Sequence, residues 1–314
     1  MRITHGVMVN SFLGDMDNNL NILNKLQRQA NTGKLFSKPS DDPFRASRSM
    51  QLYAQINANE QYSKNIKDAI NWADTTDTAL NQTTKCVQRI NELVVAAGNA
   101  TYGTQEFLAI KEEINERVAE FGQVLNTTFD GKYIFGGKDG LVKPIKIDST
   151  GGTNSIAING DKALINQSLE VEISLGVKVE YTANAIELLE FSYKDESGNA
   201  STMDVGAVFS DILNNLNSVA GQKQLLEKNL GEMQKVLDNT VAVRARVGTM
   251  QNRMDSSKKL NEAENFNLTE ILSNNEDVDV VKKAMEIGAA QTVYMASLQT
   301  SSKVLQPTIL DFLR

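Results

Sequence analysis

The chain has 314 residues, with 32 Lys or Arg against 39 Asp or Glu, a net charge of −7 and 41% hydrophobic residues. This length favours two or three domains. The acidic balance argues against a phosphate-binding surface, which needs clustered Lys and Arg, so nucleic acid is not expected as a partner. With one histidine and one cysteine, the chain forms no intrachain disulfide and no His-Glu-x-x-His zinc site.

The first predicted helix runs from about Val9 to Thr32 and ends at Gly33. Side chains at steps of three and four residues on it are Leu13, Met16, Leu20, Leu23, Gln27 and Ala30. This spacing is typical of a coiled-coil seam, in which an underwound helix returns to its partner about every 3.5 residues. Leu13, Met16, Leu20 and Leu23 are therefore predicted at an assembly interface.

The segment Ser37–Pro43 is predicted to be a hinge. Pro39 and Pro43 forbid a continuous helix through it. Asp42 followed by Pro43 predicts a helix start, since the carboxylate caps free N–H groups and proline fits the first helical position. Asp41 and Asp42 are interpreted as turn and cap residues rather than paired catalytic carboxylates.

A very long helix is predicted from Pro43 to about Ala97. Polar residues such as Asn59 and Asp77 share its apolar three-four register, and polar seam residues restrict register and partner number at a cost in stability. Gly98–Gly103 breaks this helix, and Thr104 is placed to cap the next.

The pattern changes between residues 130 and 206. Leu169, Val171, Ile173 and Leu175 alternate with polar residues, and Asp195–Asn199 is consistent with a turn. Alternation with a period of two predicts half-buried antiparallel strands. This insert also holds most of the excess of acidic over basic residues, which favours a water-facing β domain.

Helix is predicted to return from about Val208 to Leu260, followed by a looser stretch that contains Phe266 and Ile271. Ser273–Glu276 has the spacing of a capping box, and the last predicted helix follows it and ends at Pro307. Its three-four register comprises Val280, Ala284, Ile287, Gln291, Tyr294, Leu298, Ser301 and Leu305.

Gly288–Ser302, within that last helix, contains no charged residue. It is too short to span a membrane and contains glutamines and hydroxyls. We therefore expect the two ends of the chain to pair and then to bury themselves against other subunits. The predicted interface residues on this helix are Ala284, Ile287, Tyr294, Leu298 and Leu305.

No catalytic, cofactor or metal residues are predicted, and the chain is not expected to be an enzyme. Gly136–Gly140 lacks the spacing of a phosphate loop. Arg244, Arg246 and Arg253 are expected to pair with acids on a neighbouring helix rather than to bind an anion. Cys86 is interpreted as a buried helix residue rather than a catalytic thiol. A catalytic thiol needs a histidine close by in space, and the only histidine, His5, lies in a segment expected to be mobile.

Several motifs resemble the flagellin superfamily and, within it, its hook–filament junction branch. Lys38–Pro43 is similar to the family's Pro-Ser-Asp-Asp-Pro hinge, and Arg89–Thr101 to a helix end and turn, although Ala100 replaces the usual glycine. Arg246–Arg253 resembles a flagellin Arg-x-Gly-Ala-x-Gln-Asn-Arg run, with Thr249 in place of alanine. Three further segments resemble the junction branch: Met1–Ile3, Tyr133–Gly137 and Ser297–Leu313.

The resemblance covers roughly residues 1–138 and 207–314. It implies a mainly α fold with a β insert, in which the terminal helices pair into a long coiled-coil bundle. The expected division is a polymerisation region (1–42 with 274–314), a helical core (43–129 with 207–273) and a surface insert (130–206).

As to function, the resemblance implies a structural subunit of the bacterial flagellum that joins hook to filament as a ring. The implied partners are copies of itself, another hook-associated protein, flagellin and an export chaperone at the C-terminal helix. The chain would be extracellular and exported without a cleaved signal peptide. Alternatives are flagellin itself and a secreted enzyme carried in the insert.

Overall fold

The computed structural model describes residues 5–99, 103–149, 152–194, 200–217 and 221–304. The chain forms two units, one of residues 1–58 with 264–314 and one of residues 59–263. Two long helices, α2 (Pro43–Asn99) and α8 (Leu230–Glu276), contribute residues to both units. The predicted three-part division, with boundaries near residues 42 and 274, remains a prediction.

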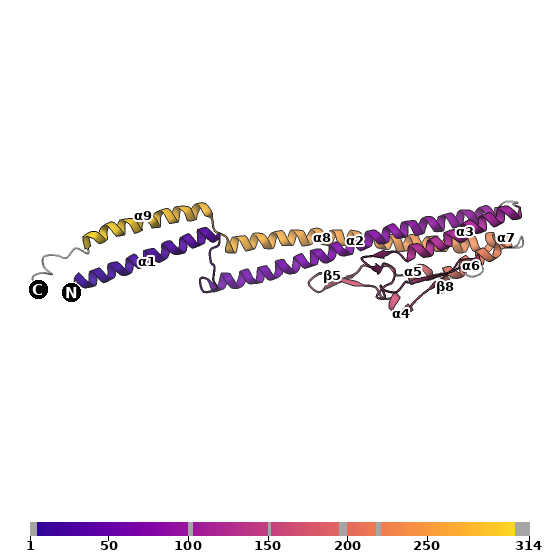
Figure 1. Cartoon of the computed structure of the whole chain (residues 1–314), viewed down its shortest axis with the longest axis horizontal. Helices are drawn as coiled ribbons and strands as arrows, with labels where there is room; N and C mark the ends of the chain where they lie inside the picture. The colour runs from indigo at the N-terminus through magenta and orange to yellow at the C-terminus, as the bar shows by residue number, and fades with distance from the viewer. Residues whose placement is uncertain (1–4, 100–102, 150–151, 195–199, 218–220, 305–314) are drawn as a thin grey trace, which may run out of the picture. The chain divides into compact units, whose positions relative to one another are not determined.

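The first unit is built on two antiparallel helices, α1 (His5–Thr32) and α9 (Val280–Val304). Figure 1 shows them side by side, and they make the most extensive contact between any two elements of the described chain. The expectation that the N- and C-terminal helices pair is confirmed. The neighbouring parts of α2 and α8 are joined by Asn275, whose Nδ2 donates to Arg45 O and Ser49 Oγ, each at 2.9 Å.

In the second unit, α2 and α8 pack with α3 (Thr104–Leu125) and α6 (Val205–Asn215) around one apolar core. The rings of Phe121 and Phe209 meet edge to face in this core, with centroids 5.3 Å apart. Edge-to-face contact is the favoured geometry for buried aromatic pairs. Both side chains are almost fully buried, so α3 and α6 are held together by large apolar groups.

The predicted β insert is present, and all four of its described sheets are two-stranded antiparallel pairs. Phe129 pairs with Lys132, Ile145 with Ile158, Val171 with Val179, and Phe191 with Met203. The strands are β1 (Thr128–Phe129), β2 (Lys132–Tyr133), β3 (Ile145–Asp148), β4 (Ser155–Ile158), β5 (Glu170–Ser174), β6 (Val177–Glu180), β7 (Glu190–Lys194) and β8 (Ala200–Asp204). Two short helices lie between them, α4 (Lys162–Ile165) and α5 (Ala185–Leu189).

The insert is packed onto the helices rather than separate from them. Ile134, Phe135, Ile145 and Leu188 belong to the same buried cluster as the helical core. Gly137 makes one close approach possible, because a Cβ there would lie 2.2 Å from Ile165 O, and its φ is +59°. Only glycine adopts such a conformation without strain. The predicted turn at Asp195–Asn199 lies outside the described residues.

The predicted helix from Val208 to Leu260 is wrong in its first part. α6 ends at Asn215, and the chain resumes with α7 (Gly221–Gln224) and a π-helical turn, η2 (Leu225–Asn229), before α8 begins. Gly221 lies close to the end of α6 at this break, since a Cβ on Gly221 would lie 2.0 Å from Asn215 O. Asn229 is fully buried in η2 and its Oδ1 accepts from Asn215 Nδ2 at 2.8 Å.

The predicted loose stretch around Phe266 and Ile271 is also wrong, since α8 continues to Glu276. Phe266 is 72% exposed, so this large apolar residue does not lie on the buried face of α8 and does not fit the helix's hydrophobic spacing. The predicted capping box at Ser273–Glu276 does not start the last helix. The cap is Asp279, whose Oδ1 accepts from the backbone N–H groups of Val281 (3.0 Å) and Lys282 (3.1 Å).

Candidate assembly surface

The seam between α1 and α9 follows a regular three-four spacing on both helices. The less exposed positions of α1 are Val9, Phe12, Met16, Asn19, Leu23, Leu26 and Gln29. Those of α9 include Lys283, Ile287, Ala290, Tyr294, Ser297 and Ser301. Because apolar positions alternate with amide, hydroxyl and ammonium groups, the seam is only partly apolar, and polar seam residues lower stability while restricting register.

The nine predicted interface residues separate into groups. Met16, Leu23, Ile287 and Tyr294 face the seam within the pair, and Leu23 is the most buried of them. Leu13, Leu20, Ala284 and Leu298 are exposed, so the sequence register mixed seam positions with outward ones. Leu305 lies outside the described residues. Sequence reasoning missed the seam residues Phe12, Leu26 and Ser297.

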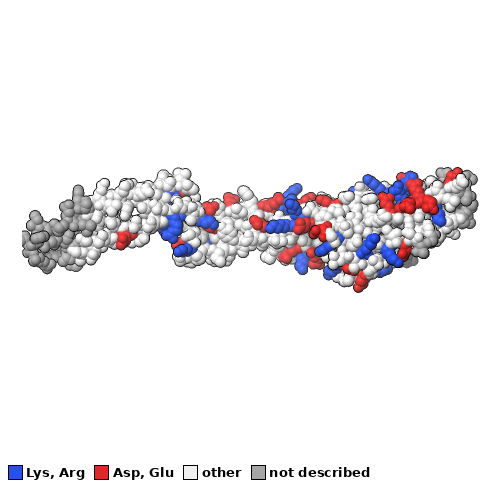
Figure 2. All heavy atoms as spheres, viewed as in Figure 1, with Lys and Arg blue, Asp and Glu red and all other residues white. Residues whose placement is uncertain are grey.

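We call the exposed apolar residues of α1 and α9 the outer face. It is extensive: its largest side chains are between 38% and 70% exposed, and they are Val7, Met8, Leu13, Leu20, Ile22, Val280, Val281, Met285, Val293, Met295 and Leu298. In Figure 2 the displayed side of α1 and α9 carries few charged side chains. Large exposed apolar surface on a helix pair marks an interaction site.

A joint connects the ends of the four helices in this unit. The α1–α2 connection, Gly33–Asp42, hydrogen-bonds to the end of α8 and the start of the α8–α9 connection: Leu35 N donates to Glu276 O at 2.7 Å, and Val278 N donates to Gly33 O at 3.0 Å. These bonds form a short antiparallel bridge between Lys34 and Asp277. The two connections are therefore fastened to each other.

The joint also contains a partly buried ion pair. The ammonium of Lys34 pairs with the carboxylate of Glu276, which is 6% exposed, and donates to the Tyr53 hydroxyl at 3.0 Å. The hydrogen bonds to Glu276 and Tyr53 raise the pKa of Lys34 above its ordinary value. A buried carboxylate is costly unless paired, and the ammonium of Lys34 offsets part of the cost of burying Glu276.

The predicted hinge residues lie in this joint. Asp42 caps α2 as expected, with Oδ1 accepting from Arg45 N at 3.0 Å, and Pro43 is the first helical residue. Asp41 holds the preceding turn: its Oδ2 accepts from the backbone N–H groups of Ser37 and Lys38, both at 3.2 Å. These bonds hold the pKa of the Asp41 carboxyl below its usual range. A hinge role for Pro39, Asp42 and Pro43 stays a prediction.

Sequence reasoning did not identify Lys34, Tyr53, Asn275 or Glu276 as joint residues. Each lies far along the chain from at least one of its partners, and no local periodicity reports such pairs. Ser273–Glu276 did match the spacing of a capping box. In the structure, however, Asn275 donates to Arg45 and Ser49 of α2 and Glu276 pairs with Lys34, so these side chains do not cap a helix start.

Among the residues that the structure describes, no group of three His, Cys, Asp or Glu side chains is placed to hold a metal ion. Nor is any described helix both long and apolar enough to cross a membrane. Cys86 is buried as predicted, and burial raises the pKa of its thiol to about 12. Arg244 and Arg246 pair with Asp77 and Glu187, which confirms pairing for those two.

Comparison with known proteins decides the family. Residues 3–139 match the bacterial flagellin N-terminal helical region, and residues 230–313 match the bacterial flagellin C-terminal helical region. The chain belongs to the flagellin family. The two matches contain α1, α2, α3, α8 and the described part of α9, so every helix of the candidate assembly surface and its joint lies within them.

Individual relatives of this flagellin-family chain include both filament and hook-associated proteins. It is 26% identical to the flagellin of Bacillus subtilis (strain 168), over 98% of this chain and 99% of that one. It is 24% identical to flagellar hook-associated protein 3 of Escherichia coli (strain K12), over 87% of this chain and 88% of that one. The crystal structure of the flagellar junction protein FlgL from Legionella pneumophila matches with a TM-score of 0.57 and 13% identity, over 74% of this chain and all of that one. The predicted fold class is confirmed.

Proposed function

We propose that the chain is a structural subunit of the bacterial flagellum that joins the hook to the filament as a ring. The observation that carries this proposal is the outer face of α1 and α9, whose large apolar side chains are between 38% and 70% exposed. A subunit that buries this face against neighbours gains about 25 cal/mol for each Å² of apolar surface removed from water. The likeness to a hook-associated protein and to a junction protein favours the junction over the filament.

The proposed partners follow from that position. Copies of the chain lie beside it in the ring, another hook-associated protein lies on the hook side, and flagellin lies on the filament side. A flagellar export chaperone covers the C-terminal helix before assembly, since Gly288–Ser302 carries no charge to keep it soluble. On this proposal the chain is exported to the cell exterior without cleavage. An intact-mass measurement on exported protein then gives the uncleaved chain.

Filament subunit is the second candidate, supported by the flagellin relative that spans almost the whole chain. Immunogold labelling separates the two. The β5–β6 turn offers an insertion site for an epitope tag, because Leu175 is 85% exposed and Gly176 has a φ of +73°. In cells whose only copy is the tagged chain, a single band at the distal end of the hook supports the junction role. Label along the whole filament overturns it and supports flagellin.

A further inference from the structure

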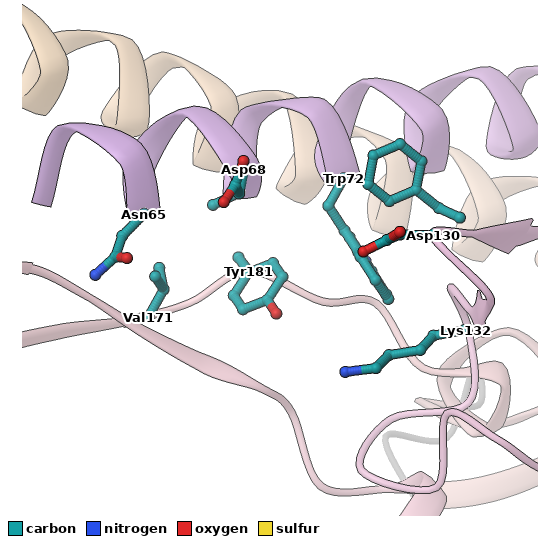
Figure 3. Close-up of a pocket in the computed structure, with 9 residues that line it drawn as sticks. Asn65, Asp68, Trp72, Asp130, Lys132, Val171 and Tyr181 are labelled. Atoms are coloured by element: carbon teal, nitrogen blue, oxygen red, sulfur yellow. The ribbon is translucent and has the colours of Figure 1, made fainter. Parts of the chain in front are cut away.

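Two exposed aromatic side chains stand on the long helices of the first unit, outside the outer face. Phe44, near the start of α2, is 78% exposed, and Phe266, near the end of α8, is 72% exposed. Trp72, further along α2 and beside the groove in Figure 3, is only 6% exposed, because the rings of Phe129 and Tyr181 meet it edge to face. A single exposed apolar side chain is ordinary, so the surroundings of Phe44 and Phe266 decide what they indicate.

Each of these two rings begins a strip of exposed residues along one helix face. The α2 strip is Phe44, Arg48 and Gln51, and the α8 strip is Phe266, Glu270 and Ser273. Steps of four and then three residues place the members of each strip one above the other on the same face. The two strips therefore present the same order of groups: an aromatic ring, a charge and an uncharged polar group.

The strips carry opposite charges and belong to segments of a single sign. Residues 43–58 of α2 contain two arginines and no acid, and residues 264–276 of α8 contain three glutamates and no Lys or Arg. Neither Arg48 nor Glu270 makes a side-chain hydrogen bond or ion pair within the described chain. Cations near the start of a helix and anions near its end gain nothing from the helix dipole. The stability of α2 and α8 therefore does not explain these signs.

The two strips lie on opposite sides of the α2–α8 pair. Ser49 and Asn275 lie in the seam between these antiparallel helices, where Asn275 Nδ2 donates to Ser49 Oγ at 2.9 Å. Helical geometry of about 100° per residue turns the α2 strip about 130° away from the seam in one rotational sense and the α8 strip about 130° in the other, each counted along its own chain. Because the helices run antiparallel, these opposite turns carry the strips to opposite sides. Arg48 and Glu270 therefore cannot meet within one subunit.

We propose that the α2 strip of one copy packs on the α8 strip of the next copy. This inference rests on the proposed function, in which copies of the chain lie side by side in a ring. Where neighbouring copies point the same way, α2 of one runs antiparallel to α8 of the next, so Arg48 beside Glu270 brings Phe44 near Ser273 and Phe266 near Gln51. The ion pair then lies between two aromatic rings.

A second copy is the occupant that both strips favour. A partner of another kind would complement the charge of one strip and leave the other in water, whereas a copy of the chain supplies both. Since the strips face opposite ways, a two-fold pair of copies cannot use both in one contact. The contact is therefore head to tail, and head-to-tail contacts generate rings where the rotation closes.

Charge reversal in whole flagella tests the contact. In cells whose only copy of the chain carries the epitope tag in the β5–β6 turn, Arg48→Glu and Glu270→Arg each bring like charges together and should abolish most of the label. The double variant restores opposite charges with their sides exchanged and should regain it. Both side chains are exposed, so the circular dichroism of each free variant stays unchanged. Glu264→Arg, exposed on α8 outside the strip, should not restore label when combined with Arg48→Glu.

Restored label in the double variant supports the contact, because the two residues cannot compensate each other inside one subunit. The contact is overturned if either single variant labels like the unaltered chain, if the double variant stays unlabelled, or if Glu264→Arg restores label as well as Glu270→Arg does. Failure of the junction role is seen separately, as label of the unaltered chain along the whole filament, and the same exchange of charges then decides whether the strips meet between filament subunits. A single band without restoration overturns the contact alone.

Discussion

Arg244 of α8 donates two parallel hydrogen bonds to the carboxylate of Asp77 of α2, from Nε to Oδ1 at 2.8 Å and from Nη2 to Oδ2 at 3.2 Å. The same guanidinium donates to Asn81 Oδ1 at 3.1 Å through Nη1. Bidentate pairs of this kind fix geometry as well as contributing energy. Asp77 lies within the long register of α2 as a polar residue, and this contact explains its presence: it sets the position of α8 along α2 within the unit of residues 59–263.

Removal of this pair is expected to destabilise the unit modestly. The two side chains are 37% and 33% exposed, so solvent screening limits the pair to about 1 kcal/mol. Arg244→Ala should lower the melting temperature by about 2–4 °C in calorimetry. Arg253→Ala is the control, because Arg253 is exposed and has no ion-pair partner within the described ranges. Equal shifts for the two variants would mean that the pair contributes nothing specific.

Local chemistry made part of the fold predictable. Helix boundaries at Gly33 and at Asp42–Pro43 follow from left-handed backbone and capping, which depend on the residue and its immediate neighbours. Alternation between Leu169 and Leu175 predicted β5 for the same reason. The break before α8 was not predicted, because apolar residues at helical spacing continue across it from Leu213 and Leu216 to Leu230 and Met233.

The candidate site was predictable in kind but not in register. Leu13 and Leu20 lie one position C-terminal to Phe12 and Asn19, and only the latter two lie in the seam with α9. Leu20 is apolar where Asn19 is polar, so the hydrophobic pattern alone favours the register that contains Leu13 and Leu20. The joint pair Lys34–Glu276 joins residues distant in the chain, and only tertiary structure reveals it.

Cys86 is expected to be unreactive in the folded chain. It is 3% exposed, and burial together with the nearby carboxylate of Glu120 raises the pKa of its thiol to about 12. An unfolded chain loses this proton near pH 8.5. The contribution of the neutral thiol to stability is therefore complete below that pH and is lost as the pH rises towards 12. Ellman's reagent at pH 8 should modify Cys86 only after urea unfolding. Rapid modification of the native chain would contradict this burial.

In the free subunit, we predict that the described parts of the two ends, residues 5–40 and about 275–304, are largely unstructured until assembly or chaperone binding. The α1–α9 seam contains Asn19, Ser297 and Ser301, and helices without sufficient apolar packing are marginal in water. Limited proteolysis should trim both ends and leave a resistant fragment that contains residues 59–263. Protection of the ends equal to that of the fragment would show that the helix pair is stable alone.

Leu298→Asp is expected to block incorporation into flagella without unfolding the subunit. Leu298 is 43% exposed on the outer face, so the aspartate is solvated in the free chain. Assembly would bury an unpaired carboxylate at a cost of several kcal/mol. Electron microscopy and motility assays of complemented cells measure the effect, with Leu298→Met as the apolar control. Normal flagella built from the aspartate variant would place Leu298 outside any subunit contact.

The last prediction concerns the joint. Pro39, within the α1–α2 connection, and Pro43, at the start of α2, interrupt helix formation between α1 and α2. The connection is hydrogen-bonded to the backbones of Glu276 and Val278. We propose that the segment Ser37–Pro43 lets the terminal helices take an angle independent of α2, so that one subunit adapts to two neighbouring geometries. Replacing both prolines with alanine should let helix spread through the segment and pull Leu35 from its bond to Glu276. The expected product is a folded, exported chain that joins hook and filament poorly, so that flagellin leaks into the medium.

Asp42→Ala is the control, since it removes a cap worth about 1 kcal/mol and keeps both prolines. Full filaments at normal frequency in the double proline variant would reduce the prolines to helix boundaries.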